Sequence, residues 1–182
     1  MGHSYREARH VSLDVTRAML RISDQAVEAI REHAVEGYPL EICGFLVGHV
    51  EGDTRIVREA WPVRNAWEDD PELRASMFAS LEETGVTASA ERWESASEER
   101  RFLVSPGDTV KAMKAAREAK MDLVGLYHTH PNHPAVPSDF DRDVAWPEWS
   151  YVIVSVRGGQ VVELRSWFVE GDGPFIEEPV LS

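Results

Sequence analysis

The chain has 182 residues, of which 43% are hydrophobic and 9% aromatic, enough for one compact domain with a buried core. Its 19 lysines and arginines against 32 acidic residues leave a formal net charge of -13, which repels phosphate backbones and anionic lipid surfaces. These numbers exclude a chain that is disordered throughout, and they argue against nucleic-acid and membrane partners.

The cysteine count and the lack of long apolar stretches bear on the compartment. Cys43 is the single cysteine, so it forms no internal disulfide and no thiolate zinc site by itself. The N-terminus has no apolar signal-peptide core, and no stretch approaches the roughly 20 apolar residues that span a bilayer. We expect a cytoplasmic protein. The sequence leaves its oligomeric state open, a homodimer included.

The first predicted element lies in an N-terminal extension, residues 1–22, that precedes a domain over residues 23–182. Val11, Leu13 and Val15 alternate with the period of two of a half-buried strand, which predicts an edge strand there.

A helix and a hairpin are predicted next. Ser23 is the expected cap of the helix, and Gly37 is its expected end. The apolar run from Ile42 to Val50 is typical of a buried strand, and Thr54 to Val63 is its predicted partner across the turn at 51–53.

The window from Ala66 to Arg100 differs in composition from the rest of the chain. Its ten acidic residues and three arginines account for -7 of the net charge of -13. Such a segment predicts an insertion that is partly helical and mobile. A solvated face is its simplest role, and a flap that covers a functional site is the alternative.

The second half of the chain predicts one long helix among four strands. The helix begins after the cap Ser105 and runs to about Lys120, with Val110, Met113 and Ala116 on its buried side. The predicted strands are 102–104, 123–127, 151–156 and 161–168. The predicted fold class is therefore α+β, a mixed sheet flanked by helices.

Two histidines follow directly where strand 123–127 is expected to end. His128 and His130 are separated by one residue, so their side chains point the same way and can bind one ion. Ser138 and Asp141 are three residues apart, which places both on the first turn of a short helix. Two imidazoles and one carboxylate give a tetrahedral zinc three ligands and leave the fourth position to water, as in a catalytic site.

Amide hydrolysis by a zinc-bound water also needs a base and an oxyanion donor. Glu41 begins the first hairpin strand and is the predicted general acid/base, which takes a proton from water and returns it to the leaving amine. Ser138 offers a hydroxyl to the oxyanion that forms at the carbonyl, and one such donor is worth about 2.7–4 kcal/mol.

Together these residues resemble the signature of the JAMM (MPN+) zinc metalloproteases. The likeness rests on Glu41 at the start of Glu-Ile-Cys-Gly, on His128-x-His130-Pro, and on Pro-Ser138-x-x-Asp141. It spans roughly residues 23–168. Its His-Ser-Asp part is specific because four residues with reactive or metal-binding side chains stand at fixed spacing. The compact length and the segment PLEICGFLVG are most similar to the small prokaryotic, Mec-like members.

The resemblance implies a fold, a cofactor and a reaction. The fold is a single MPN domain with a curved mixed sheet in a cytidine-deaminase-like layout. One Zn²⁺ is held by His128, His130 and Asp141, Glu41 is the general acid/base, and Ser138 stabilises the tetrahedral intermediate. The reaction is hydrolysis of the isopeptide or peptide bond after the C-terminal glycine of a ubiquitin-like or sulfur-carrier protein with a Gly-Gly tail. Mec-type members instead free cysteine from a sulfur-carrier adduct.

Three other interpretations explain parts of the pattern. Ser138-x-x-Asp141 is itself a capping box, a role that can coexist with metal binding because a carboxylate has two oxygens. A non-catalytic MPN scaffold is expected to lack ligands, whereas every ligand position is filled here. The HxHxDH pattern of metallo-β-lactamase-like hydrolases needs an aspartate where Asn132 stands, so that class is rejected.

Overall fold

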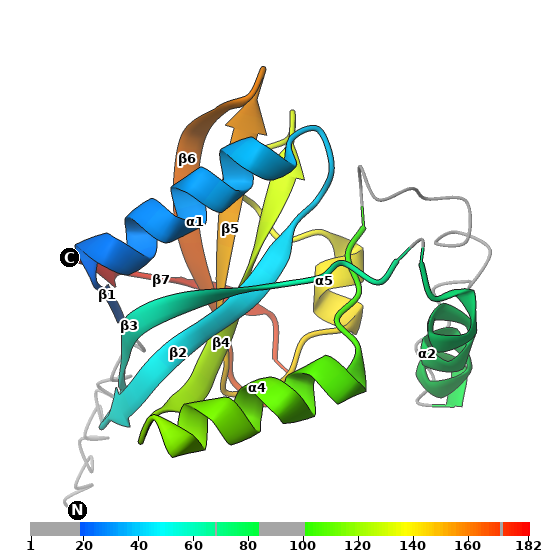
Figure 1. Cartoon of the computed structure of the whole chain (residues 1–182), viewed down its shortest axis with the longest axis horizontal. Coiled ribbons are helices and arrows are strands. Elements are labelled where there is room, and N and C mark those ends of the chain that lie inside the picture. The colour runs from blue at the N-terminus through cyan, green and yellow to red at the C-terminus, as the bar shows by residue number, and fades with distance from the viewer. Residues whose placement is uncertain (1–18, 68, 84–100, 172) are drawn as a thin grey trace, which may run out of the picture.

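The computed structural model describes residues 19–67, 69–83, 101–171 and 173–182, which form one eight-stranded sheet with packed helices (Figure 1). The helices are α1 (Asp24–Gly37), α2 (Pro71–Glu83), α4 (Pro106–Glu118) and α5 (Asp139–Asp143). The strands are β1 (Met19–Ile22), β2 (Cys43–Glu51), β3 (Thr54–Val63), β4 (Asp122–Pro131), β5 (Ser150–Arg157), β6 (Gln160–Val169), β7 (Phe175–Glu178) and β8 (Val180–Leu181). The predicted α+β class with a mixed sheet is confirmed.

The last two strands close the sheet on itself. The strand order is β7-β6-β5-β4-β2-β3-β1-β8, and only Pro179 separates β7 from β8 in the chain. The segment 175–181 therefore pairs with β6 through β7 and with β1 through β8. Because both edges of the sheet are paired in this way, neither leaves a long row of unpaired backbone groups.

Helices α1 and α4 lie on either side of the β2–β3 hairpin (Figure 1). Ser23 caps α1, as predicted, by accepting a hydrogen bond from the backbone N–H of Ala26 at 3.2 Å. The buried face of α1 packs on one core cluster, which contains Leu46 and Tyr127, and α4 packs on a second cluster, which contains Phe45 and Leu126. The side chains of successive strand residues thus pack on opposite faces of the sheet, as the pleat requires.

The predicted buried side of α4 is wrong at two of its three positions. Ala116 is buried, but Val110 is 65% exposed and Met113 is 36% exposed. Thr109 is the other buried residue of α4, and Ala112 packs beside the second core cluster. The small Ala116 takes the position nearest the sheet, whereas Val110 and Met113 line an open cavity of about 610 Å³ and so stay partly in contact with solvent.

The predicted strand at Phe102 to Val104 is also wrong. These residues belong to no strand, because their backbone hydrogen bonds go to a loop instead of a ladder. The Leu103 carbonyl accepts from the backbone N–H of Ala66 at 2.8 Å, and the Leu103 N–H donates to the Asn65 side chain at 3.0 Å.

Several boundaries differ from those predicted. β4 continues past Tyr127 to Pro131, so His128 and His130 lie within the strand and not after it. In the described part of the acidic window, residues 71–83 form the helix α2. Residues 84–100 and the predicted strand at Val11 to Val15 lie outside the described residues. Within the described ranges, no helix is both long enough and apolar enough to cross a bilayer.

A glycine in β4 is predicted to be required for strand spacing. A Cβ at Gly125 would lie 2.1 Å from the backbone oxygen of Ser150, so Gly125→Ala forces β4 and β5 apart. We expect a loss of about 1–3 kcal/mol in the free energy of unfolding, measured by denaturant titration. Gly107→Ala is the control, since its Cβ would meet only the Ser105 hydroxyl at 3.8 Å, and its stability should match or exceed the parent value.

Candidate metal centre

Strand β4 supplies two imidazoles to one side of the sheet. His128 and His130 are both buried and share a face, while Thr129 between them points the other way. The Thr129 hydroxyl accepts from the backbone N–H of Ile42 at 3.0 Å, and the Thr129 N–H donates to the Ile42 carbonyl at 3.0 Å. These two bonds fix β4 beside the segment that carries Glu41.

Helix α5 supplies a carboxylate that its own capping box orients. The Ser138 hydroxyl accepts from the Asp141 N–H at 3.2 Å, and the Ser138 N–H donates to Asp141 Oδ2 at 2.6 Å. The Ser138 hydroxyl also donates to the same oxygen at 2.7 Å. The capping role that the sequence predicted is therefore present, and it holds the Asp141 carboxylate in one orientation.

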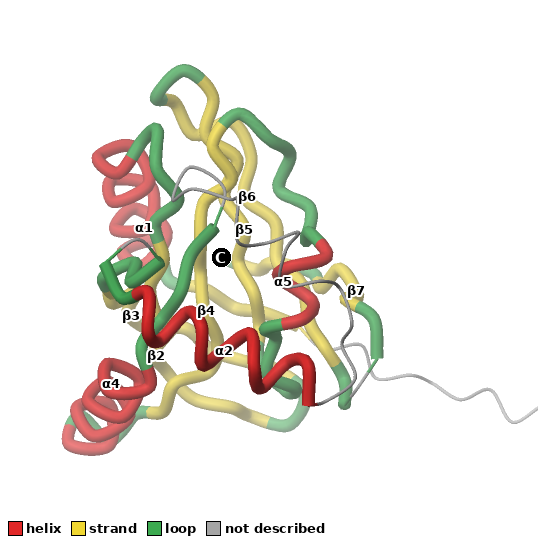
Figure 2. The backbone as a smooth tube through the Cα atoms, turned by 90° about the vertical axis from the view of Figure 1, so that its right-hand side faces the viewer, coloured by secondary structure: helices red, strands yellow, loops and turns green. Residues whose placement is uncertain are grey.

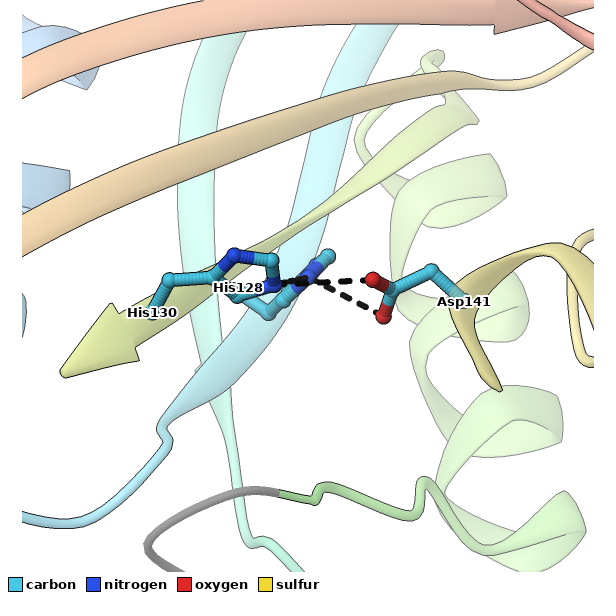
Figure 3. Close-up of side chains that lie close together, drawn as sticks. All are labelled: His128, His130 and Asp141. Carbon is cyan, nitrogen blue, oxygen red and sulfur yellow. Dashed lines mark hydrogen bonds and ion pairs between the residues drawn. The ribbon is translucent and has the colours of Figure 1, made fainter. Parts of the chain in front are cut away.

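The three side chains converge on one point, as Figure 3 shows. The two histidine Nε2 atoms are 3.1 Å apart. His128 Nε2 lies 3.2 Å from Asp141 Oδ1, and His130 Nε2 lies 3.5 Å from Asp141 Oδ2. One potential ligand atom from each residue thus lies within 4.8 Å of the others, which makes this a group that could hold a metal ion.

Burial and charge prepare these groups for a cation. Burial raises the pKa of the Asp141 carboxyl, but the charges and hydrogen bonds of the two histidines outweigh it and hold that pKa well below its usual range. Burial lowers the pKa of His128, whereas the hydrogen bond and charge of Asp141 raise the pKa of His130 despite its burial. An ionised carboxylate and a neutral imidazole are the forms that bind metals, and a cation can replace the proton that His130 attracts.

Neighbouring groups fix both rings. The ring of Phe102 stacks on His128 with centroids 4.5 Å apart. His130 Nδ1 lies 2.9 Å from the Pro134 carbonyl oxygen, which accepts a hydrogen bond from the Nδ1–H and leaves Nε2 free for the ion. The loop after β4 is attached to the sheet, because the Ser155 hydroxyl on β5 donates a hydrogen bond to the His133 carbonyl at 2.6 Å.

Glu41 lies in the wall of a cavity next to this group. The cavity has a volume of about 340 Å³, and its lining comprises Glu41, Arg101, His130, His133, Pro134, Val136 and Ser138. Glu41 is only 7% exposed, and burial raises its pKa to about 8 against the opposing charges of His130 and Arg101. The predicted acid/base residue and oxyanion donor therefore share one cavity with a predicted metal ligand.

Asn65 and Arg101 are functional candidates that the sequence did not reveal. The Asn65 amide nitrogen donates to the backbone carbonyls of Glu41, at 3.0 Å, and Arg101, at 2.9 Å. Its oxygen accepts from the N–H groups of Trp67 and Leu103, both at 3.0 Å. A lone asparagine after a strand carries no motif, so only the folded arrangement identifies it as the residue that joins both walls of the cavity.

Other residues that the sequence singled out lie elsewhere. Cys43 is fully buried, and its thiol donates to the Val63 carbonyl at 3.8 Å, so it serves as a small core residue. Trp146 and Trp149 line a separate, mostly apolar cavity of about 610 Å³ that α2 and α4 border. Figure 2 shows α2 and α5 on the same side of the molecule.

Comparison with known proteins places the chain in a family. The model for prokaryotic homologs of the JAB domain matches residues 23–170. The desampylase of Haloferax volcanii is 32% identical over 150 residues, covering 79% of this chain and 86% of that protein. The CysO-cysteine peptidase of Mycobacterium tuberculosis is 31% identical over 163 residues, covering 89% of this chain and 90% of that protein.

A solved structure agrees with these matches. A protein of Desulfitobacterium hafniense superposes with a TM-score of 0.65 at 25% identity, covering 90% of this chain and 92% of that one. The predicted JAMM/MPN membership is therefore confirmed, and the relatives place the chain among hydrolases. The chain belongs to the family of prokaryotic homologs of the JAB domain.

Proposed function

We propose that this protein is a metal-dependent peptidase that hydrolyses the isopeptide or peptide bond after the C-terminal glycine of a ubiquitin-like or sulfur-carrier protein. The observation that carries the proposal is the buried convergence of His128, His130 and Asp141 beside Glu41. The desampylase and CysO-cysteine peptidase among the relatives support this class of substrate.

We propose that His128, His130 and Asp141 hold one Zn²⁺. Imidazole nitrogen and carboxylate oxygen suit zinc, and three protein ligands are typical of a catalytic site. The ion would supply Lewis-acid activation of water and of the scissile carbonyl.

Glu41 is the proposed proton carrier. During hydrolysis the water oxygen bonds to the glycine carbonyl carbon, the carbon–nitrogen bond breaks, and one water proton ends on the leaving amine. A Glu41 carboxylate oxygen can accept that proton and return it to the amine nitrogen. The burial that raises its pKa to about 8 favours this role, because the carboxyl group can exchange protons near neutral pH.

Ser138 is the proposed donor to the oxyanion. Among the described residues that line the cavity, it carries the only hydroxyl. The α5 capping box fixes its backbone, while its hydroxyl, which donates to Asp141 Oδ2 at 2.7 Å, would turn from that oxygen to the carbonyl oxygen as negative charge develops there.

A zinc-loaded sample tests the function directly. The assay uses a host ubiquitin-like protein in two forms, joined to a lysine side chain and extended by one cysteine as in the Mec-type alternative. We expect release of a carrier that ends in Gly-Gly, detected by intact-protein mass spectrometry. A sample that binds zinc stoichiometrically and cleaves neither form would favour the non-catalytic scaffold.

Glu41→Gln is expected to lower kcat by about 10²–10⁴-fold while zinc content and unfolding temperature stay unchanged, because a proton carrier is lost and no ligand is. Steady-state kinetics and metal analysis measure both. Glu32→Gln, an exposed position on α1, is the matched control. Activity retained by Glu41→Gln removes Glu41 from the mechanism.

Asp141→Ala is expected to reduce bound zinc to a small fraction of one ion per chain, because it removes the anionic ligand. Atomic emission spectroscopy of dialysed protein gives the ratio. Asp139→Ala is the control on the same helix, since the Asp139 side chain is 52% exposed and pairs with Arg142. Equal zinc content in the two variants contradicts the proposed ligand set.

Ser138→Ala is expected to lower kcat by about 10²–10³-fold through loss of the oxyanion donor. Ser138→Thr retains a hydroxyl that can both cap α5 and donate, so it should keep most of the activity. If both variants lose activity equally, the hydroxyl is not the active group.

A further inference from the structure

We propose that Trp167 is a positioning residue for the metal centre, because its indole N–H holds the loop after β4 where that loop orients the ligand His130. This inference rests on the metal site of the proposed function and adds a residue of β6 to it. It depends on how side chains of the sheet bind the backbone of residues 133–135.

Strands β4, β5 and β6 are neighbours in the sheet and carry the groups concerned (Figure 1). In the strand register His130 on β4 is level with Ser155 on β5, and Ser155 is level with Glu163 on β6. Residues at matching positions on neighbouring strands place their side chains on the same face of the sheet. These three side chains therefore form one row across the sheet, which begins at a proposed metal ligand.

The loop after β4 folds back over this row. The Pro134 carbonyl accepts a hydrogen bond from His130 Nδ1–H at 2.9 Å. The neighbouring carbonyl of His133 accepts from the Ser155 hydroxyl at 2.6 Å, and Ser155 is fully buried. Two successive carbonyls of the loop are thus bound by two successive members of the row.

Trp167 and Glu163 hold the next residue of the loop, Ala135, from both of its backbone groups. The indole Nε1–H of Trp167 donates to the Ala135 carbonyl at 3.1 Å, and the Ala135 N–H donates to Glu163 Oε2 at 3.4 Å. Ala135 is fully buried, so its backbone groups cannot exchange these partners for bulk water. The two bonds therefore fix the backbone of Ala135 against β6.

A planar peptide unit transmits this constraint to the metal ligand. The Pro134 carbonyl and the Ala135 N–H belong to the same peptide unit, so the direction of the carbonyl is set once Ala135 is held. That carbonyl binds Nδ1 of His130, whose Nε2 lies 3.5 Å from Asp141 Oδ2. Partners of the second nitrogen of a ligand histidine fix the orientation of its ring, and through it the metal affinity.

The indole of Trp167 is held in turn by its neighbours. The Cζ atom of Arg165 lies 4.7 Å from the centre of the Trp167 ring, and the Arg165 guanidinium binds both carboxylate oxygens of Glu177 on β7. The ring also packs beside the core cluster that contains Phe45. A donor that packing has already ordered loses little side-chain entropy when it binds the loop.

Zinc affinity tests the inference without any substrate. Metal-free protein is titrated with Zn²⁺ against a chromophoric chelator, which gives Kd. Trp167→Phe keeps an aromatic ring and removes the donor, so we expect Kd to rise about 3- to 10-fold, as loss of one ordinary hydrogen bond predicts. Trp61→Phe on β3 is the matched control, since it also removes an indole hydrogen bond, to Glu59 at 2.7 Å, and should keep the parent Kd. Equal Kd values for the two variants overturn the inference.

Hydrogen exchange separates a role at the metal from a role in the loop alone. In zinc-free Trp167→Phe the amide of Ala135 should exchange about 3- to 10-fold faster than in the parent protein, because the loop opens more readily. Parent rates in β4 and β5 would show that the sheet is intact. Faster exchange of Ala135 with an unchanged zinc Kd means that Trp167 stabilises the loop without acting on the metal centre, and the inference fails.

Ser155→Ala keeps the test decisive if Trp167→Phe does not fold. It removes the donor to the His133 carbonyl of the same loop and should also raise the zinc Kd, and an unchanged Kd contradicts the inference. Hydrolysis is measured in parallel on zinc-saturated samples. A parent protein that binds zinc and cleaves no adduct contradicts the proposed function, whereas the ratio of the Kd values still decides the role of Trp167.

Discussion

A buried carboxylate between two imidazoles is the constraint around which this structure is arranged. Asp141 is only 3% exposed, and an ionised carboxylate at such depth costs several kcal/mol unless partners compensate it. The capping box of α5 donates two hydrogen bonds to one of its oxygens, and the Nε2 atoms of His128 and His130 face the two oxygens. The polar centre is therefore kept in place by groups from two separate segments, β4 and the first turn of α5.

The surrounding frame makes that geometry rigid. Thr129 fixes β4 to the segment of Glu41, and Asn65 joins the same segment to Arg101 and Leu103. Phe102 then lies flat against His128, which closes the apolar side of the centre. A site held by packed side chains and satisfied hydrogen bonds keeps its geometry better than one on a free loop, and such precision is what hydrolytic chemistry demands.

The family relationship explains the fold, whereas the residues that line the cavity bear on the choice of substrate. Membership of the prokaryotic JAB family accounts for the fold and for a hydrolytic centre. The relatives carry the different names desampylase and CysO-cysteine peptidase, so the shared pattern alone does not determine the substrate. Arg101, which lies outside the His-Ser-Asp motif, lines the same cavity as Glu41 and Ser138.

Local rules were sufficient for much of the fold. Ser23, Ser105 and Ser138 were identified as caps because each places a hydroxyl next to the first N–H groups of its own helix. The hairpin of β2 and β3 followed from two apolar runs around a short turn, and the common face of His128 and His130 followed from strand periodicity. The metal and catalytic roles of the site residues stay predictions, although the convergence expected of them is present.

Contacts between distant segments decided the rest. The apolar residues Phe102 to Val104 predicted a strand. Instead, the backbone N–H of Leu103 donates to the side chain of Asn65, 38 residues earlier, and is not available to a neighbouring strand. The spacing of Val110 and Met113 predicted that they are core residues, yet they border an open cavity between α4 and other elements and remain exposed. Capping and side-chain alternation depend on neighbours a few residues apart and can be read from the sequence. The partners of Asn65, the rotation of α4 and the place of Arg101 depend on which surfaces meet, and the tertiary structure alone determines that.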